Sequence, residues 1–362
     1  MGTIRTASGA TIYHGPRGGT VVVRERAGVR TVSWGRHGGY VEHPYPGGWR
    51  GHEYRVRTYW VGGRSYVVSY RAYYWGGRPY YWYVPRFYYH PAYYGWAYNP
   101  WAAPVVYRWG WFGAPWYGFY GSYFTPYPAY LGANLWLTDY ILAENLRLAY
   151  EAQAAPPPAY VVEGEAPRTL SPEAKQLIAE EVRRQLAAEQ QAAALQSSGA
   201  AVAAAQSANQ PPPALDPAQR IFIVDSNLDI QTANGGCGLT AGDILLRTGD
   251  NLVDGTKVAV SVQSSKQGDC APGASGSVEV ADLQEMHNHF REQLDAGMQQ
   301  LADNSGQNGL PHAPDTSTIP SNDVPPAAPD GDAQSQVQGL QGEADRAEKD
   351  VTAAGSGQGG AY

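Results

Sequence analysis

Two histidines and a Ser-Ser-Lys triplet are the side chains of this sequence whose types could support catalysis or metal binding. His287 and His289 occupy positions i and i+2 of an expected helix, where side chains point about 200° apart and do not readily share a metal ion. Ser264, Ser265 and Lys266 are contiguous, which differs from the SxxK spacing of serine acyl-enzymes. The sequence has no GxSxG motif, no P-loop, and no GxGxxG motif after an expected strand. We therefore expect no catalytic residues, no metal site and no cofactor.

The two cysteines, Cys237 and Cys270, have no CxxC spacing and no histidine at metal-ligand spacing beside them. We expect them to form a disulfide, with two unrelated buried thiols as the alternative. A disulfide indicates an oxidising compartment, so we expect a periplasmic, outer-surface or extracellular location. The opening MGTIRTASG has no apolar segment of a signal peptide, so we expect a start upstream or a non-classical export route. No apolar run is long enough to predict a transmembrane helix.

Aromatic residues and charge are distributed very unevenly along the chain. All 11 tryptophans lie between Trp34 and Trp136, and 24 of 27 tyrosines lie at or before Tyr140. Up to Leu137 the chain has 14 arginines, no lysine and three glutamates, a net charge of +11, whereas the remainder carries −18. The sequence therefore consists of two halves of different chemistry.

The aromatic half has the residue types of several binding surfaces. Arginine contacts phosphates and rings stack on bases, which would suit nucleic acid, but the densest aromatics after Arg86 include only Arg108. Strand alternation favours arginines on a sheet surface beside tyrosine rings. Flat rings also stack on sugars, although this half has few carboxylates. The expected association or glycan-contact residues are Trp60, Trp75, Trp96, Trp101, Trp109, Trp111, Trp116, Arg55 and Arg57.

The fold class expected from the hydrophobic patterns is mainly β with added helices, an α+β protein. Residues 1–85 alternate in polarity, and Gly-Gly pairs at 18–19, 38–39, 47–48, 62–63 and 76–77 predict an antiparallel β-meander with tight turns. Residues 86–153 predict an irregular coil packed by aromatic rings, followed by a helix from about residue 133.

The second half predicts a helix, a small β-domain and a tail. Residues 154–218 read as linkers flanking a helix at about 171–195, with Ser171 as its N-cap and Pro172 in its first turn. Residues 219–302 predict a small β-barrel with a C-terminal helix, which Asp282 would cap. Residues 303–362 are rich in Pro, Gly, Gln, Ser and Asp, and we expect them to be disordered.

The aromatic stretches at 94–101, 123–128 and 136–140, together with Asp282–Ala302, resemble a group of usually exported bacterial proteins of no known activity. Those proteins have a Tyr/Trp/Gly-rich N-terminal half and a small C-terminal β-domain, so the resemblance implies export. Separately, residues 238–246 resemble the Gly-Leu-x-x-Gly-Asp turn of PDZ domains, and the short strands of 219–302 resemble an SH3-like barrel.

Together these features predict a non-catalytic exported or cell-envelope protein. Its aromatic half would be a structural, self-associating or surface-attaching module, with the segment around Arg55–Trp60 as an open edge for lateral pairing. The β-domain would bind or assemble, so the chain would form oligomers. Glycan binding through the aromatic block is the alternative function, and nucleic-acid binding is the second alternative. We expect self-association, or a polysaccharide or envelope protein as partner, and we do not expect nucleic acid.

Overall fold

The computed structural model describes residues 3–6, 8–14, 20–34, 38–151, 168–198, 210–233 and 235–356, with side chains described up to residue 350. It contains both strands and helices, in agreement with the expected α+β class, and its strand pairs are antiparallel. Much of the expected linkers, at 152–167 and 199–209, lies outside the described residues. No described helix is long and apolar enough to cross a membrane.

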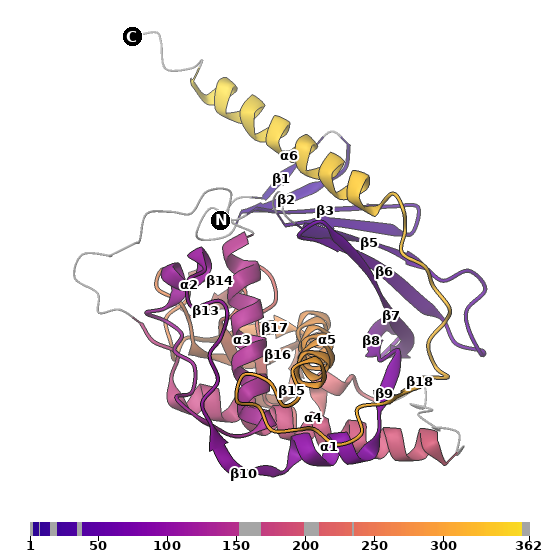
Figure 1. Ribbon diagram of the computed structural model, residues 1–362. Helices are drawn as coiled ribbons and strands as arrows, with labels where there is room; N and C mark the ends of the chain where they lie inside the picture. The colour runs from indigo at the N-terminus through magenta and orange to yellow at the C-terminus, as the bar shows by residue number, and fades with distance from the viewer. Residues whose placement is uncertain are drawn as a thin grey trace.

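An eight-stranded sheet occupies the N-terminal part of the chain, with every strand hydrogen-bonded to its neighbours in sequence order. Its strands are β1 (Thr3–Arg5), β2 (Thr11–His14), β3 (Thr20–Arg26), β4 (Val29–Ser33), β5 (Gly38–Pro44), β6 (Tyr54–Val61), β7 (Arg64–Trp75) and β8 (Arg78–Val84). Figure 1 shows this sheet curving around the helices of the second half. The segment Arg55–Trp60 belongs to β6, which pairs with β5 and β7 on its two sides. The expectation of an open edge at this segment is therefore wrong.

Glycine pairs make the tight turns on either side of the long strand β7. Gly62 and Gly63 have φ of 57° and 79° and close the β6–β7 turn, and Gly76 and Gly77 repeat this geometry before β8. Positive φ at both turn residues is favourable for glycine and matches the twist of a hairpin. By contrast, the pair 38–39 lies within β5 rather than in a turn, and a side chain there would overlap Trp34 at Gly38 and Val337 at Gly39.

The aromatic segment after the sheet is more regular than an irregular coil. Its elements are β9 (Phe87–Tyr89), α1 (Pro91–Tyr98), β10 (Pro100–Val105), α2 (Pro115–Tyr120), β11 (Tyr130–Gly132) and α3 (Ala133–Glu151). Prolines begin α1 and α2, where the missing backbone N–H is not needed. The rings of this segment pack with α3 and with α4 (Pro172–Ser197) into the largest core of the molecule. Ser171 caps α4 as predicted, accepting a hydrogen bond from Ala174 N at 3.0 Å.

The second sheet has six strands in the order β12-β15-β16-β17-β13-β14. They are β12 (Ile221–Ile223), β13 (Leu228–Thr232), β14 (Gly235–Leu239), β15 (Ile244–Val253), β16 (Lys257–Ser264) and β17 (Ser275–Glu279), preceded by the 3-10 turn η1 (Pro213–Leu215). The described strands form no closed barrel, because β12 and β14 do not pair, so the expected barrel is not seen. The predicted disulfide joins Cys237 to Cys270.

Helix α5 (Val280–Asp303) lies between the two sheets (Figure 1). The predicted apolar stripe is buried along it: Leu283, Met286, Phe290, Leu294, Gly297, Met298 and Leu301. The helix starts earlier than its sequence indicated, with Glu279 at the N-cap position, so Asp282 does not cap it. It begins earlier because β17 leads directly into it and Val280 N donates to Thr256 O at 2.8 Å.

Within the described residues, up to 356, the C-terminal stretch that we expected to be disordered forms regular structure packed on the rest of the chain. Strand β18 (Thr318–Pro320) pairs with β9, and α6 (Ala333–Ser356) crosses the face of the sheet opposite to α5 (Figure 1). Ala333 and Val337 pack on Val41 and Trp60 in this layer. Helix α6 thus packs on one face of the first sheet, and α5 lies on the side of the other face, where it contacts β8.

Candidate functional site

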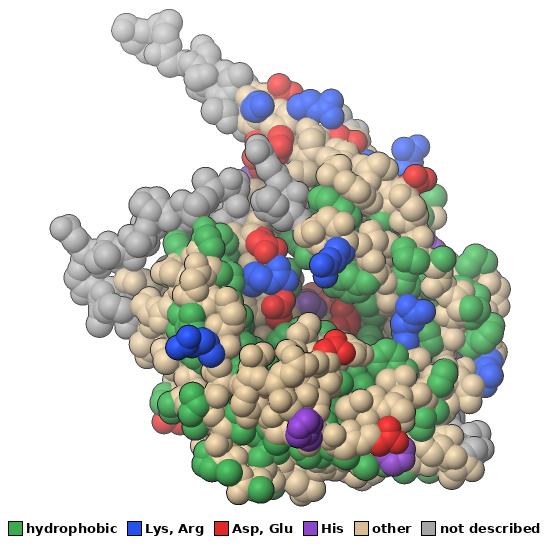
Figure 2. All heavy atoms as spheres, viewed as in Figure 1, with side chains coloured by type: hydrophobic (Ala, Val, Ile, Leu, Met, Phe, Trp, Pro, Cys, Tyr) green, Lys and Arg blue, Asp and Glu red, His purple; other side chains and the backbone are tan. Residues whose placement is uncertain are grey.

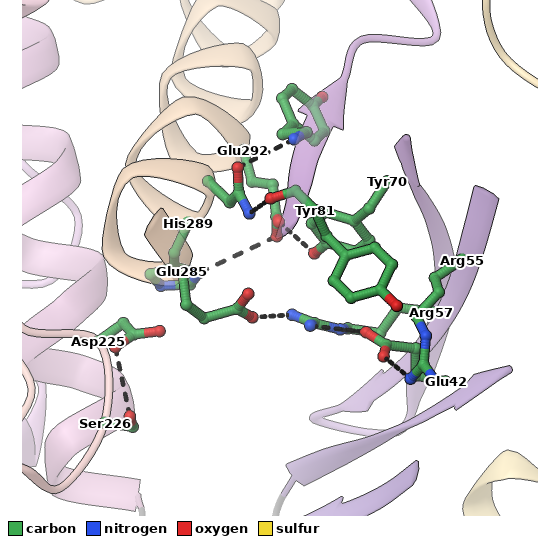
Figure 3. Close-up of polar contacts among 12 residues, drawn as sticks. Glu42, Arg55, Arg57, Tyr70, Tyr81, Asp225, Ser226, Glu285, His289 and Glu292 are labelled. Carbon is green, nitrogen blue, oxygen red and sulfur yellow. Dashed lines mark hydrogen bonds and ion pairs between the residues drawn. The ribbon is translucent and has the colours of Figure 1, made fainter. Parts of the chain in front are cut away.

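The concave face of the first sheet meets a row of polar side chains on α5. Glu285, His289 and Glu292 are spaced i, i+4 and i+7, so they lie along one side of the helix. Figure 3 shows Glu285 and Glu292 directed toward Arg57 and Tyr70 of the sheet, with His289 beside Glu292. The apolar stripe of α5 packs into the core, so this polar row lies on the side of the helix that is next to the first sheet.

Arg57 is the centre of this interface. Strand register places it opposite Glu42, and its Nε and Nη2 donate to Glu42 Oε2 at 3.0 and 2.7 Å. Its Nη1 donates to Tyr59 Oη at 2.9 Å and to a carboxylate oxygen of Glu285 on α5. Arg55 adds a bond of 2.6 Å to Glu42 Oε1. A single buried guanidinium, 4% exposed, therefore connects the sheet to the helix.

Tyrosine rings enclose the charged groups. The Arg57 guanidinium lies 4.1 Å from the centre of the Tyr40 ring and 4.4 Å from that of Tyr70, a favourable cation–π geometry. Tyr59 Oη and Tyr70 Oη are 3.2 Å apart, and the Tyr70 hydroxyl donates to Glu292. The hydrogen bonds thus run from Glu42 through Arg57 and two tyrosines to Glu292.

Burial and charge shift the pKa values of Glu42 and Glu292, the two carboxyl groups at the ends of this network, in opposite directions. Burial opposes the ionisation of Glu42, but the positive charge of Arg57, together with Arg55, holds its pKa below the usual value. Burial raises the pKa of Glu292 to about 7, and the charge of Arg57 only partly offsets that effect. Burial also lowers the pKa of His289 to about 4, so this imidazole is neutral at pH 7.

Further carboxyl groups lie beside Glu285, at the start of α5. Burial, and then the negative charge of Glu285, raise the pKa of Asp225 to about 7 (Figure 3). Burial and the charge of Glu279 raise the pKa of Asp282 to about 6, although its side chain is exposed.

A hollow between the sheet and the helices contains basic, acidic and histidine side chains (Figure 2). At its wall Tyr66 is 47% exposed and stacks on Tyr59, with ring centres 4.9 Å apart and planes 15° from parallel. The surrounding protein, and then the negative charge of Glu292, raise the pKa of the Tyr66 hydroxyl. The charges of Arg147 and Glu144 on α3 have smaller, opposing effects on the pKa of this hydroxyl.

The residues singled out from the sequence are distributed over several sites. Arg55 and Arg57 lie in the interface just described. Trp60 is 7% exposed and packs under α6, and Trp75 packs against the core of the second sheet. The other five tryptophans belong to the aromatic core, where Trp101, Trp109 and Trp116 are 8%, 6% and 6% exposed. Little of these three ring surfaces is available to a ligand.

Sequence reasoning missed Glu42, Glu285, Glu292 and Tyr66 as members of one site. The available signal was the polar row on α5, opposite its apolar stripe, in an acidic half that follows a basic one. No group of three or more His, Cys, Asp or Glu side chains in the described parts of the chain could hold a metal ion. No protein-family model, curated protein or solved structure matches this chain.

Proposed function

We propose that the protein is a non-catalytic carbohydrate-binding module whose ligand lies in the hollow between the first sheet and helices α3 and α5. The observation that carries the proposal is Tyr66, an exposed ring held flat against Tyr59 in a concavity rich in carboxylates. Flat exposed rings stack on the apolar faces of sugars, and a ring fixed by a neighbour loses little entropy when it binds.

The hollow also supplies the hydrogen-bonding groups that the aromatic half lacks. Glu285 and Glu292 side chains are 34% and 10% exposed, and His289 is 19% exposed. On α3, Arg147 bonds to Glu144 and Glu151, each at 2.7 Å, with all three side chains between 28% and 30% exposed. Closely spaced donors and acceptors of both signs suit an array of hydroxyl groups better than they suit a polyanion such as nucleic acid.

The positions of the arginines support the same choice. Arg24 and Arg57 have carboxylate partners from the acidic half of the chain, at Glu343 and Glu285. Part of the basic charge of the first half is therefore neutralised by carboxylates of the second half. Strand β6 cannot pair with a second copy of the chain, since β5 and β7 already occupy both of its sides.

The proposal includes an exported location, where a surface glycan would be available. The Cys237–Cys270 disulfide supports it, since such bonds persist in oxidising compartments. Attachment to a cell-surface or matrix polysaccharide would then be the role of the protein.

The test is retention of the full chain on immobilised polysaccharides and on a glycan array. Tyr66→Ala should weaken binding to a retained glycan by about tenfold, whereas Tyr66→Phe, which keeps the ring, should bind within about twofold of the native chain. Tyr74→Ala is the matched control, because Tyr74 lies at the far end of β7 with a similar exposure of 50%. Equal losses for Tyr66→Ala and Tyr74→Ala would contradict a site in the hollow.

Incubation with each retained glycan provides the second readout. Glu292 holds a proton near neutral pH while Glu285 is ion-paired with Arg57, and one protonated and one ionised carboxyl are also what glycoside hydrolysis requires. We expect no release of reducing ends. If the native chain releases reducing ends and Glu292→Gln does not, the protein is a glycoside hydrolase rather than a binding module.

A further inference from the structure

A second cavity, of about 270 Å³, lies on the other side of α5, where it meets β8 and α4. Apolar walls are formed by Val84, Pro85, Tyr88, Ala192 and the ring of Trp82. Its charged and polar lining includes Arg71, Arg184, Glu189, His287, Arg291 and Asp323. This combination of an apolar wall with convergent polar groups is typical of small-molecule sites.

Within the described chain, His287 lacks a hydrogen bond that the protein itself could supply. It is 6% exposed, and its Nδ1 has no hydrogen-bond partner among the described residues. Burial, and then the charges of Arg291 and Arg184, keep its pKa well below the usual value, so the ring is neutral and offers one donor and one acceptor. A buried ring nitrogen without a partner destabilises the protein, and a hydroxyl group of a ligand would supply the missing hydrogen bond.

The three arginines of the cavity differ in whether a carboxylate neutralises their charge. Arg184 donates two hydrogen bonds to Glu181, at 2.9 and 2.6 Å. Arg291 lies 3.6 Å from Glu189, and the Nε of this arginine has no partner in the described structure. These two guanidinium groups therefore have carboxylates beside them.

Arg71 has no such carboxylate. It is 8% exposed, its Nη2 lies 2.7 Å from His52 Nε2, and its guanidinium lies over Trp82 at 5.6 Å. Burial and the charge of Arg71 lower the pKa of His52, so this neighbour does not neutralise it. No ion pair joins Arg71 to a carboxylate within the described ranges, although Asp323 also lines the cavity. A buried cation in this position favours an anionic ligand.

We propose that this cavity binds a small organic carboxylate with an apolar or aromatic body and a hydroxyl group. The carboxylate pairs with Arg71, the body packs on Trp82 and Tyr88, and the hydroxyl group hydrogen-bonds to His287. The site is separate from the hollow that holds Tyr66, so it stands whether or not the protein binds carbohydrate.

Binding of 3-phenyllactate to the full chain, measured by calorimetry and by quenching of tryptophan fluorescence, tests the proposal. We expect its amide, which lacks the charge, and inorganic phosphate, which lacks the apolar body, to bind at least about tenfold more weakly. Failure of 3-phenyllactate to bind, or equal binding of the amide or of phosphate, would overturn the assignment.

Variants locate the binding. Ala188 is exposed at the cavity, so Ala188→Trp should block the cavity without disturbing the core and abolish binding. Ala194→Trp is the matched control, because Ala194 is exposed on the same helix and does not line the cavity. His287→Phe keeps a ring of similar shape and should weaken binding by about tenfold, with a thermal melt to confirm folding. Unchanged affinity in Ala188→Trp, or equal losses in both tryptophan variants, would contradict the site.

Discussion

Asn288 on α5 completes the hydrogen bonding of Tyr83 on the edge strand β8. Its Oδ1 accepts from Tyr83 N at 2.9 Å, and its Nδ2 donates to Tyr81 O at 2.9 Å. Arg291 adds a bond of 3.2 Å to Tyr83 O. One amide side chain thus takes the place of a neighbouring strand, and the second half of the chain covers an edge that would otherwise be open to pairing.

Replacing Asn288 by alanine should destabilise the protein by about 1–3 kcal/mol, because Tyr83 N–H and Tyr81 C=O would remain buried without partners. Urea unfolding followed by tryptophan fluorescence measures the change. Gln300→Ala, at an exposed position of the same helix, should change the free energy of unfolding by less than about 0.5 kcal/mol. Similar values for the two variants would show that the edge contact contributes nothing specific.

Arg57→Met should be among the most damaging single changes. It leaves Glu42, which is 4% exposed, without its main partner, and removing one member of a buried pair typically costs about 3–5 kcal/mol. Glu285 contributes less to that cost, since its side chain is 34% exposed. The free energy of unfolding of Arg57→Met should therefore rise by at least about 1 kcal/mol when Glu42→Leu is added. A double variant less stable than Arg57→Met would contradict the pairing.

Local features of the fold could be predicted from sequence, because local chemistry decides them. The Ser171-Pro172 start of α4 and the glycine turns around β7 follow from backbone preferences of those residues. The disulfide followed from the absence of any other role for two cysteines in one β-rich segment.

The candidate site could not be predicted, because its contacts join residues far apart in the chain. Arg57 and Glu285 are separated by 228 positions, and no local pattern shows which acidic residue faces which arginine. The end of the chain was misjudged for another reason. Its composition indicates disorder, yet Ala333, Val337, Leu340 and Ala344 repeat at helical spacing and are buried on the sheet. Composition averaged over the tail concealed this stripe.

Loss of the Cys237–Cys270 bond should destabilise the second sheet. The two Cα atoms are 5.3 Å apart and the residues are separated by 33 positions, and a loop of this length corresponds to about 3–4 kcal/mol in the chain-entropy account. The double variant Cys237→Ala/Cys270→Ala should show this loss without reductant. Adding reductant should lower the melting temperature of the native chain and leave that of the variant unchanged. A reductant effect on the variant would point to a cause other than this disulfide.

The raised pKa of Glu292 predicts a specific dependence of stability on pH. The folded chain keeps this carboxyl protonated up to about pH 7, whereas the ordinary value is 4.5. Its contribution to stability is therefore fully present below about pH 4.5 and is lost as the pH rises through 7. His289 acts in the opposite sense, since its lowered pKa makes its contribution fall as the pH drops from 6.5 toward 4.

Comparison of Glu292→Gln with the native chain isolates the carboxyl from the histidine. Glutamine also accepts a hydrogen bond from Tyr70 and cannot ionise, so the variant should gain about 2–3 kcal/mol relative to the native chain between pH 5 and pH 8. Urea unfolding at half-unit pH intervals measures this difference. Glu180→Gln, on the exposed side of α4, should show no comparable change. A difference between Glu292→Gln and the native chain that stays constant with pH would mean that Glu292 is ionised throughout this range, with Arg57 outweighing its burial.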